Sequence, residues 1–155
     1  MSNKTSRAEL LASLAQAGRE HSDATVLFHA TVARMLELNL TDYKALGVLE
    51  RLGALSAGDI GRHTGLASAS VTNLLDRLER KGFVRRVDDP ADRRRVLVEA
   101  VREKLSGAER VFASTRQSVA RLYDGYSEKE LAVIADFLRR NAERLRAETA
   151  RLEAG

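Results

Sequence analysis

The apolar residues of this chain follow helical spacing almost throughout, and that spacing is broken once, directly after Gly82. Residues 83–87 and 94–100 are rich in valine and carry no helical stripe, and the polar loop 88–93 between them holds the only proline. The pattern predicts a β-hairpin with a long tip. We therefore expect a mainly α fold that contains one small β-hairpin.

Four helices are expected before the hairpin. They cover residues 6–38, residues 42–51, about eight residues from Ser56, and residues 68–81. Thr41 and Ser68 are the predicted N-caps of the second and fourth helices, and Ser56 with Asp59 resembles a capping box. Gly18 leaves open whether the first helix is bent or broken, because glycine costs about 1 kcal/mol relative to alanine inside a helix.

Two helices are expected after the hairpin, over residues 102–124 and 128–152. The sequence Ser127-Glu128-Lys129-Glu130 is a capping box at the start of the second one. That helix carries an apolar seam with spacings of three, four and seven residues, made of Leu131, Ile134, Leu138, Leu145 and Leu152. A seam on a terminal helix usually packs against another helix. We expect it to form a dimer together with the first helix, and packing within one chain is the alternative.

The third and fourth helices are joined by a tight turn at residues 65–67, which is the arrangement of a helix-turn-helix. In such a unit the second helix enters the major groove of DNA. Ile60 and Leu66 supply apolar contacts, and Gly61 leaves room for the two helices to cross closely. The buried stripe of the second helix is expected to be Val71, Leu74, Leu75 and Leu78.

Subtracting that stripe leaves a polar outer face on the same helix. Its residues predicted to contact DNA are Ser68, Ser70, Thr72, Asn73 and Arg77. Hydroxyls and the N–H groups of a first helical turn bind phosphate, asparagine pairs with adenine, and arginine pairs with guanine. The plainer alternative is a helical hairpin whose polar residues only cap and solvate the helix.

A β-hairpin directly after a helix-turn-helix makes a winged helix. The wing residues predicted to contact DNA are Arg86, Asp92, Arg93, Arg94 and Arg95. Arginines suit a narrow minor groove, where negative potential is concentrated. Asp92 can accept a hydrogen bond from the Arg94 guanidinium or from that of a neighbouring arginine and hold the tip rigid, whereas Asp88 and Asp89 would repel phosphate if they pointed the same way.

The distribution of charge supports this prediction. The chain has a formal net charge of +4, from 26 Lys and Arg against 22 Asp and Glu. Residues 62–95 hold nine basic and five acidic residues, so the whole surplus lies within them. That placement favours a segment that faces a polyanion. From charge alone, a solvated surface is the alternative.

Several classes of protein are disfavoured. The 155 residues contain no cysteine, and the three histidines, His21, His29 and His63, lack metal-ligand spacing. There is no Gly-rich phosphate loop and no nucleophile elbow, so we expect no enzyme, no cofactor and no metal. No apolar stretch reaches the roughly 20 residues of a membrane span, and the start does not read as a secretory signal. Cytoplasmic residence is therefore expected.

The chain resembles the MarR family of bacterial transcription regulators over residues 41–100. The segments that carry the resemblance are Leu40-Thr41 with Leu46 and Leu49, Leu66-Ala67-Ser68, Val71-Thr72, residues 78–82 and the wing residues 88–94. The resemblance implies a winged helix-turn-helix DNA-binding domain over residues 41–100, flanked by a helical dimerisation region at residues 6–38 and 102–153. In the family, an aspartate and an arginine at the positions of Asp92 and Arg94 are characteristic, and the arginine reaches the minor groove.

The resemblance further implies a homodimer on pseudo-palindromic double-stranded DNA, and a repressor released by a small aromatic or phenolic effector. His29, Arg34 and Met35 are candidates to line an effector pocket, with core or dimer packing as the alternative. A winged helix that docks protein without reading DNA is the second class of function left open. The chain departs from the family after the wing, where Ala100-Val101 and Lys104 replace the usual Leu-Thr and glycine, so the start of the next helix stays open.

Overall fold

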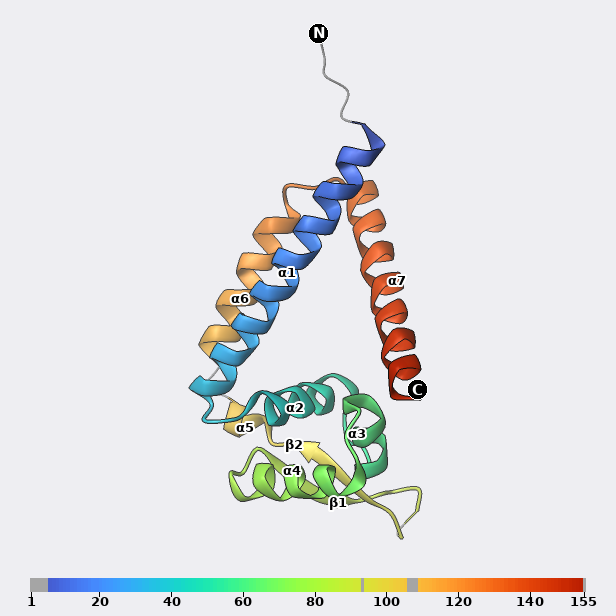
Figure 1. The fold of residues 1–155 in the computed structure, drawn as a ribbon. Helices are drawn as coiled ribbons and strands as arrows, with labels where there is room; N and C mark the ends of the chain where they lie inside the picture. Colours follow the sequence, from blue (N-terminus) through green and yellow to red (C-terminus); the bar gives the residue numbers. More distant parts are fainter. Residues whose placement is uncertain (1–5, 93, 106–108, 155) are drawn as a thin grey trace. The chain divides into compact units, whose positions relative to one another are not determined.

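The fold is described from a computed structural model that covers residues 6–92, 94–105 and 109–154. The chain divides into two compact units, Met1–Ala108 and Glu109–Gly155. Figure 1 shows the helices and strands of each unit. As expected from the sequence, helices dominate, and one antiparallel hairpin is the sheet of the first unit.

The first unit begins with the four expected helices. They are α1 (Arg7–Met35), α2 (Leu40–Leu52), α3 (Ala57–Thr64) and α4 (Ser68–Arg80). The helix α1 is continuous through Gly18, which has no atom near the place where a Cβ would stand. Ser6 caps α1 through a full capping box with Glu9, which stabilises the first turn.

Three helix boundaries differ from the sequence-based prediction. The first helix ends at Met35 rather than near residue 38, because Glu37 adopts a left-handed backbone with φ 55°. The predicted cap Thr41 is wrong, since Asn39 is the N-cap of α2 and its side chain accepts a hydrogen bond from the Asp42 N–H at 2.7 Å. Ser68 is not a cap either: it is the first residue of α4, and the extended Ala67 precedes it without a side-chain hydrogen bond.

The hairpin follows α4 and consists of β1 (Val84–Asp88) and β2 (Val96–Ala100). Val84 pairs with Ala100 and Asp88 with Val96, so the second strand begins two residues later than expected. On its other edge β2 forms a bridge between Val98 and Leu55. In Figure 1 the loop between the strands projects past the helices of this unit.

One apolar core holds the winged helix together. The predicted stripe of α4 is confirmed, because Val71, Leu74, Leu75 and Leu78 are all buried. Ile60 of α3 is fully buried beside it. A Cβ added to Gly61 would stand 3.4 Å from Val71 Cγ2 of α4 and 3.2 Å from the Leu66 carbonyl oxygen of the turn, which confirms the close crossing of α3 and α4. The core thus fixes which face of α4 points outward.

The region after the hairpin contains α5 (Arg102–Leu105), and the second unit contains α6 (Glu109–Tyr123) and α7 (Glu128–Glu153). One helix was expected over residues 102–124; its residues 106–108 lie outside the described part of the chain. The predicted capping box at Ser127 and Glu130 is confirmed. None of the described helices is long and apolar enough to cross a membrane.

Candidate nucleic-acid interface

The outer face of α4 carries exposed polar side chains. Ser68, Ser70, Thr72 and Asn73 are all exposed, as predicted for residues opposite the buried stripe. The Thr72 hydroxyl donates to the Ser68 carbonyl oxygen at 3.1 Å. The residue before α4, Ala67, makes no side-chain capping hydrogen bond, so the N–H groups of the first turn lack that acceptor. Such a helix start favours an approaching phosphate.

Arg77 differs from the other predicted residues of α4. Its Nη2 donates to Asp42 Oδ1 at 2.7 Å, and its Nε donates to Asp42 Oδ2 at 3.1 Å. The Asp42 side chain is 3% exposed, whereas the Arg77 side chain is 39% exposed. The hydrogen bond to Asp42 raises the pKa of Arg77 above its usual value. The guanidinium is therefore directed toward α2, and its predicted pairing with guanine stays a prediction.

The arginines of β1 also have acidic partners. Arg86 forms ion pairs with Glu79 and with Asp76, the latter at 2.6 Å, so it bridges β1 to α4. Arg85 pairs across the hairpin with Glu99 at 2.6 Å. All of these groups are partly or largely exposed, where ion pairs contribute little to stability. These contacts orient the arginines without removing them from solvent.

The tip of the hairpin presents Arg94 to solvent. Its side chain is 93% exposed, and its Nε lies 3.4 Å from Asp92 Oδ1. The same oxygen accepts the Arg94 backbone N–H at 3.0 Å, and the Asp92 carbonyl accepts the Arg95 N–H at 2.8 Å. Asp92 therefore holds the turn that presents Arg94. Arg93, also predicted to contact DNA, lies outside the described residues.

Arg95 lies near the base of the tip between two acids. Its guanidinium is 3.6 Å from Asp89 and 3.8 Å from Asp59. Asp89 is buried and accepts the Ala91 N–H at 2.8 Å, while Asp88 is exposed within β1. A hydrogen bond from Ser56 lowers the pKa of Asp59. Asp89 is thus turned into the hairpin, away from the position in which it would repel phosphate.

Asp42 and Asp59, which pair with the predicted arginines Arg77 and Arg95, were not predicted from the sequence. A signal for Asp42 was present, because it lies four and seven residues before Leu46 and Leu49 on the apolar stripe of α2. An acid on a buried stripe needs a cation or hydrogen-bond donors. Asp59 gave no comparable signal, because its contact with Arg95 depends on where the hairpin lies.

A basic hollow lies between α1, α2 and α3. Its volume is about 640 Å³, and its lining includes His29, Tyr43, Lys44, Arg51 and His63. The Lys44 ammonium contacts His29 Nδ1. The His29 ring lies 5.8 Å from the Tyr43 ring and 5.6 Å from the Phe28 ring. Of the three residues expected to line an effector pocket, His29 is in this hollow, while Arg34 is exposed and donates to Thr31 at 3.1 Å.

The electrostatics of this basic hollow favour an anion. Burial, and then the nearby Lys44 charge, lower the pKa of His29. Burial, and then the Arg51 charge, lower the pKa of Lys44. Among the described residues, Lys44 and Arg51 have no salt bridge to a carboxylate. Two cations that repel each other are stabilised when a small anion lies between them.

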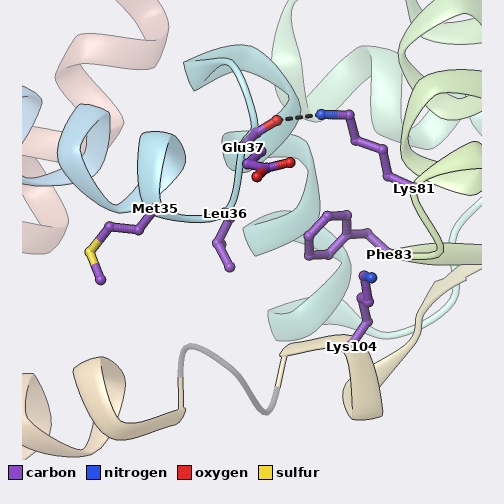
Figure 2. Close-up of a pocket in the computed structure, with 6 residues that line it drawn as sticks. All are labelled: Met35, Leu36, Glu37, Lys81, Phe83 and Lys104. Atoms are coloured by element: carbon purple, nitrogen blue, oxygen red, sulfur yellow. Dashed lines mark hydrogen bonds between the residues drawn. The ribbon is translucent and has the colours of Figure 1, made fainter.

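Besides the ion pair of Arg77 and Asp42, a second contact ties the end of α4 to the turn between α1 and α2. The Lys81 ammonium donates to the Glu37 carbonyl oxygen (Figure 2). Lys104 lies over the Phe83 ring at 5.8 Å from its centroid. These residues, with Leu36 and the largely exposed Met35, line a hollow of about 420 Å³. Met35 therefore lines this hollow rather than the basic one.

Known proteins share this sequence pattern and this fold. Residues 38–96 match the profile of the MarR family. YcgE of Bacillus subtilis, an uncharacterized HTH-type transcriptional regulator, is 38% identical over 153 residues, which cover 99% of this chain and 99% of YcgE.

Two solved structures have the same fold. FabT of Streptococcus pneumoniae, solved in complex with DNA, matches with a TM-score of 0.67 and 19% identity over 89% of this chain and 98% of FabT. NadR, solved in complex with 4-hydroxyphenylacetate, matches with a TM-score of 0.61 and 20% identity over 92% of this chain and 98% of NadR. The full-length relationship to YcgE, together with the matching profile, shows that the chain belongs to the MarR family of HTH-type transcriptional regulators.

Proposed function

We propose that the protein is a transcriptional repressor that binds a pseudo-palindromic operator as a homodimer and is released by a small aromatic anion. The observation that carries the proposal is an exposed polar face on α4 and an exposed arginine at the hairpin tip within one compact unit. A helix in the major groove and a hairpin in the adjacent minor groove require two such surfaces. The DNA complex of FabT supports DNA as the partner.

The residues of α4 divide into two groups. Ser68, Ser70 and Thr72 contact phosphate, since they stand in the first turns beside N–H groups without a capping side chain. Asn73 reads a base edge in the major groove, where an amide can bond adenine in a bidentate way. Phosphate contacts set the register of the protein and the amide supplies sequence preference.

The wing supplies the minor-groove contact. Arg94 enters the groove, and Asp92 shapes the turn from which it extends. Arg86 and Arg95, which are paired with acids in the free protein, exchange those partners for phosphate on binding. Arg93 is assigned to the same groove from the sequence alone.

A second copy of the chain is the partner that covers the exposed apolar residues of α1 and α7. The leucines concerned are 51–75% exposed and comprise Leu10, Leu11, Leu14, Leu138, Leu145 and Leu152. Rows of apolar side chains of this kind mark association surfaces. A twofold homodimer presents two copies of α4 to the two halves of a palindrome.

The basic hollow is the proposed effector site. Lys44 and Arg51 supply charge for a carboxylate or phenolate, and the rings of His29 and Tyr43 supply an aromatic wall. The bound 4-hydroxyphenylacetate of NadR supports this class of ligand. A ligand that binds the free protein more tightly than the DNA-bound protein lowers the affinity for DNA. The ratio of its two affinities sets the largest possible effect.

The DNA part is tested by selecting duplexes from a random pool and measuring affinity against salt. The wild type should prefer a palindrome over random duplex, with an affinity that falls steeply with salt. Arg94→Ala should weaken binding to all sequences about tenfold and reduce the salt slope by about one. Asn73→Ala should instead relax preference at one base pair, where it costs about 1–3 kcal/mol.

The exposed Arg146 of α7 offers a control, and Arg146→Ala should leave binding unchanged. No preference for any duplex at moderate salt would refute DNA readout, and an unchanged affinity across salt would favour protein docking. Light scattering that gives a 17.1 kDa particle would refute the dimer. For the effector, a panel of aromatic acids should raise the melting temperature of the wild type and not of Lys44→Met.

A further inference from the structure

An ion pair between a buried carboxylate and a partly exposed arginine joins α2 to the recognition helix α4. Asp42 is 2% exposed and lies in the first turn of α2. Its Oδ1 accepts from Arg77 Nη2 at 2.7 Å, and its Oδ2 accepts from Arg77 Nε at 3.1 Å and from Asn39 Nδ2 at 3.0 Å. Both carboxylate oxygens are therefore occupied, and the guanidinium meets them with two donors in a fixed plane.

This geometry restrains α4 in a way that its apolar stripe does not. Hydrophobic contacts are non-directional, so the leucines of α4 hold the helix in place with little control over small rotations. A bidentate pair is directional, since both bonds lengthen when α4 turns about its axis. Ser70 and Asn73 lie seven and four residues before Arg77, on the same side of the helix. By fixing the rotation of α4 about its axis, the ion pair therefore also fixes the direction in which Ser70 and Asn73 point.

A second contact supports the same restraint. The Lys81 ammonium holds the Glu37 carbonyl oxygen at the end of α4 (Figure 2). Residues 37–42 thus attach to α4 at two points, one turn apart. Thr41, Tyr43 and Lys44, which neighbour Asp42 in the first turns of α2, line the basic hollow.

We propose that Asp42 and Arg77 are positioning residues for DNA binding: they aim α4, and neither of them contacts a base. This inference rests on the proposed function, in which α4 enters the major groove. It replaces guanine readout by Arg77 with a role that is exerted through Ser70 and Asn73. Since the opposite side of the same turn lines the basic hollow, the pair also provides a direct connection from that hollow to α4.

The test compares Asp42→Asn, Arg77→Lys and the double variant on the selected operator and on operators with each base pair replaced. Both single variants should weaken the selected operator by a similar factor, about tenfold, with an unchanged salt slope, and any loss of base preference should be shared by both variants and fall on the base pair that Asn73→Ala relaxes. The double variant should be no weaker than the worse single variant, because the residues act as a unit. A base contact by Arg77 would instead flatten preference at one base pair in Arg77→Lys and not in Asp42→Asn.

Amide hydrogen exchange of the free protein provides a measurement that needs no DNA. Both variants should exchange faster in residues 68–80, with no change in α7, whereas Arg94→Ala should alter DNA affinity without altering exchange in α4. If the wild type selects no duplex, the proposed function fails while the exchange data still test the restraint. Unchanged exchange in α4, or a loss of base preference in Arg77→Lys that Asp42→Asn does not share, would overturn the proposal. Arg77→Lys keeps a cation beside Asp42, so it serves if Asp42→Asn does not fold.

Discussion

Arg77 at the junction of α2 and α4 and Arg94 at the hairpin tip are the same residue type in opposite environments. Arg77 meets a carboxylate that is 3% exposed, while Arg94 is 93% exposed and, within the described part of the chain, pairs with Asp92 of its own turn. The counter-charge at the junction is thus buried, whereas the one at the tip is partly exposed. An arginine paired with a buried acid contributes to the shape of the protein, while an exposed arginine paired only within its own turn is available to a polyanion.

The contrast between arginines that pair with acids across the fold and those that do not also affects how the cluster of positive charge at residues 62–95 is interpreted. Residues 62–95 carry the whole surplus of the chain, yet Arg62, Arg77, Arg85 and Arg86 each form a salt bridge with an acid. Some of those acids, such as Asp42 and Glu99, lie outside the cluster in sequence. A count of charges along the chain therefore overstates how many arginines are free to contact DNA.

The largest expected effect is on stability and separates the two arginines. Arg77→Met leaves the buried Asp42 carboxylate without its cation, and removal of one partner of a buried pair costs about 3 kcal/mol or more. Arg94→Met removes an exposed side chain and should change the free energy of unfolding by less than about 0.5 kcal/mol. Urea unfolding followed by circular dichroism measures both values.

Asp42→Ala is the control for this prediction. It leaves Arg77 without its partner, and because the Arg77 side chain is 39% exposed, water can solvate the charge. We therefore expect Asp42→Ala to cost less than Arg77→Met. Equal unfolding free energies for Arg77→Met and Arg94→Met would show that the junction is no more constrained than the tip.

The sequence predicted the parts of this comparison that depend on periodicity. The buried stripe of α4 follows from apolar residues three and four apart, and Gly61 was expected where α3 crosses α4. The caps Thr41 and Ser68 were wrong by one or two residues, because Asn39 and Ala67 have the extended backbone that precedes a helix. Local propensity for Ser and Thr does not distinguish a cap from a first-turn residue.

Side-chain partners far apart in sequence could not be predicted in this way. Asp42 and Arg77 are 35 positions apart, and their contact exists because the core brings α2 against α4. Periodicity indicates that each lies on a given face of its helix and does not indicate which faces meet. For the same reason, Arg77 and Asn73 looked equivalent on the outer face of α4, although one is paired and the other is exposed.

A smaller effect is expected when the hairpin turn is loosened. Asp92→Ala removes the acceptor of the Arg94 N–H, so the tip samples more conformations before it reaches DNA. We expect operator affinity to fall about threefold to tenfold, which is about 1 kcal/mol, measured by fluorescence anisotropy. The variant with both Asp92→Ala and Arg94→Ala should bind no worse than Arg94→Ala alone. An additive loss would mean that Asp92 acts independently of Arg94.

The smallest expected effect is on the pH dependence of stability, and it distinguishes the basic hollow from the hairpin tip. His29 faces Lys44, Tyr43 and Phe28, and burial followed by the Lys44 charge lowers its pKa below the usual 6.5. A base with a lowered pKa in the folded state disfavours protonation there, so stability is highest above pH 6.5 and falls as pH decreases below that value.

Thermal unfolding from pH 7.5 to pH 5.5 should therefore lower the melting temperature of the wild type more than that of His29→Gln. Burial raises the pKa of Glu50, which also titrates toward the acidic end, but Glu50 is present in both proteins and cancels from their difference. Asp92→Ala, at the tip, should follow the wild type, because no histidine is among the described partners of that turn. Parallel curves for the wild type and His29→Gln would show that the Lys44 contact leaves the imidazole free to protonate. In that case the basic hollow would be as open to solvent as the hairpin tip.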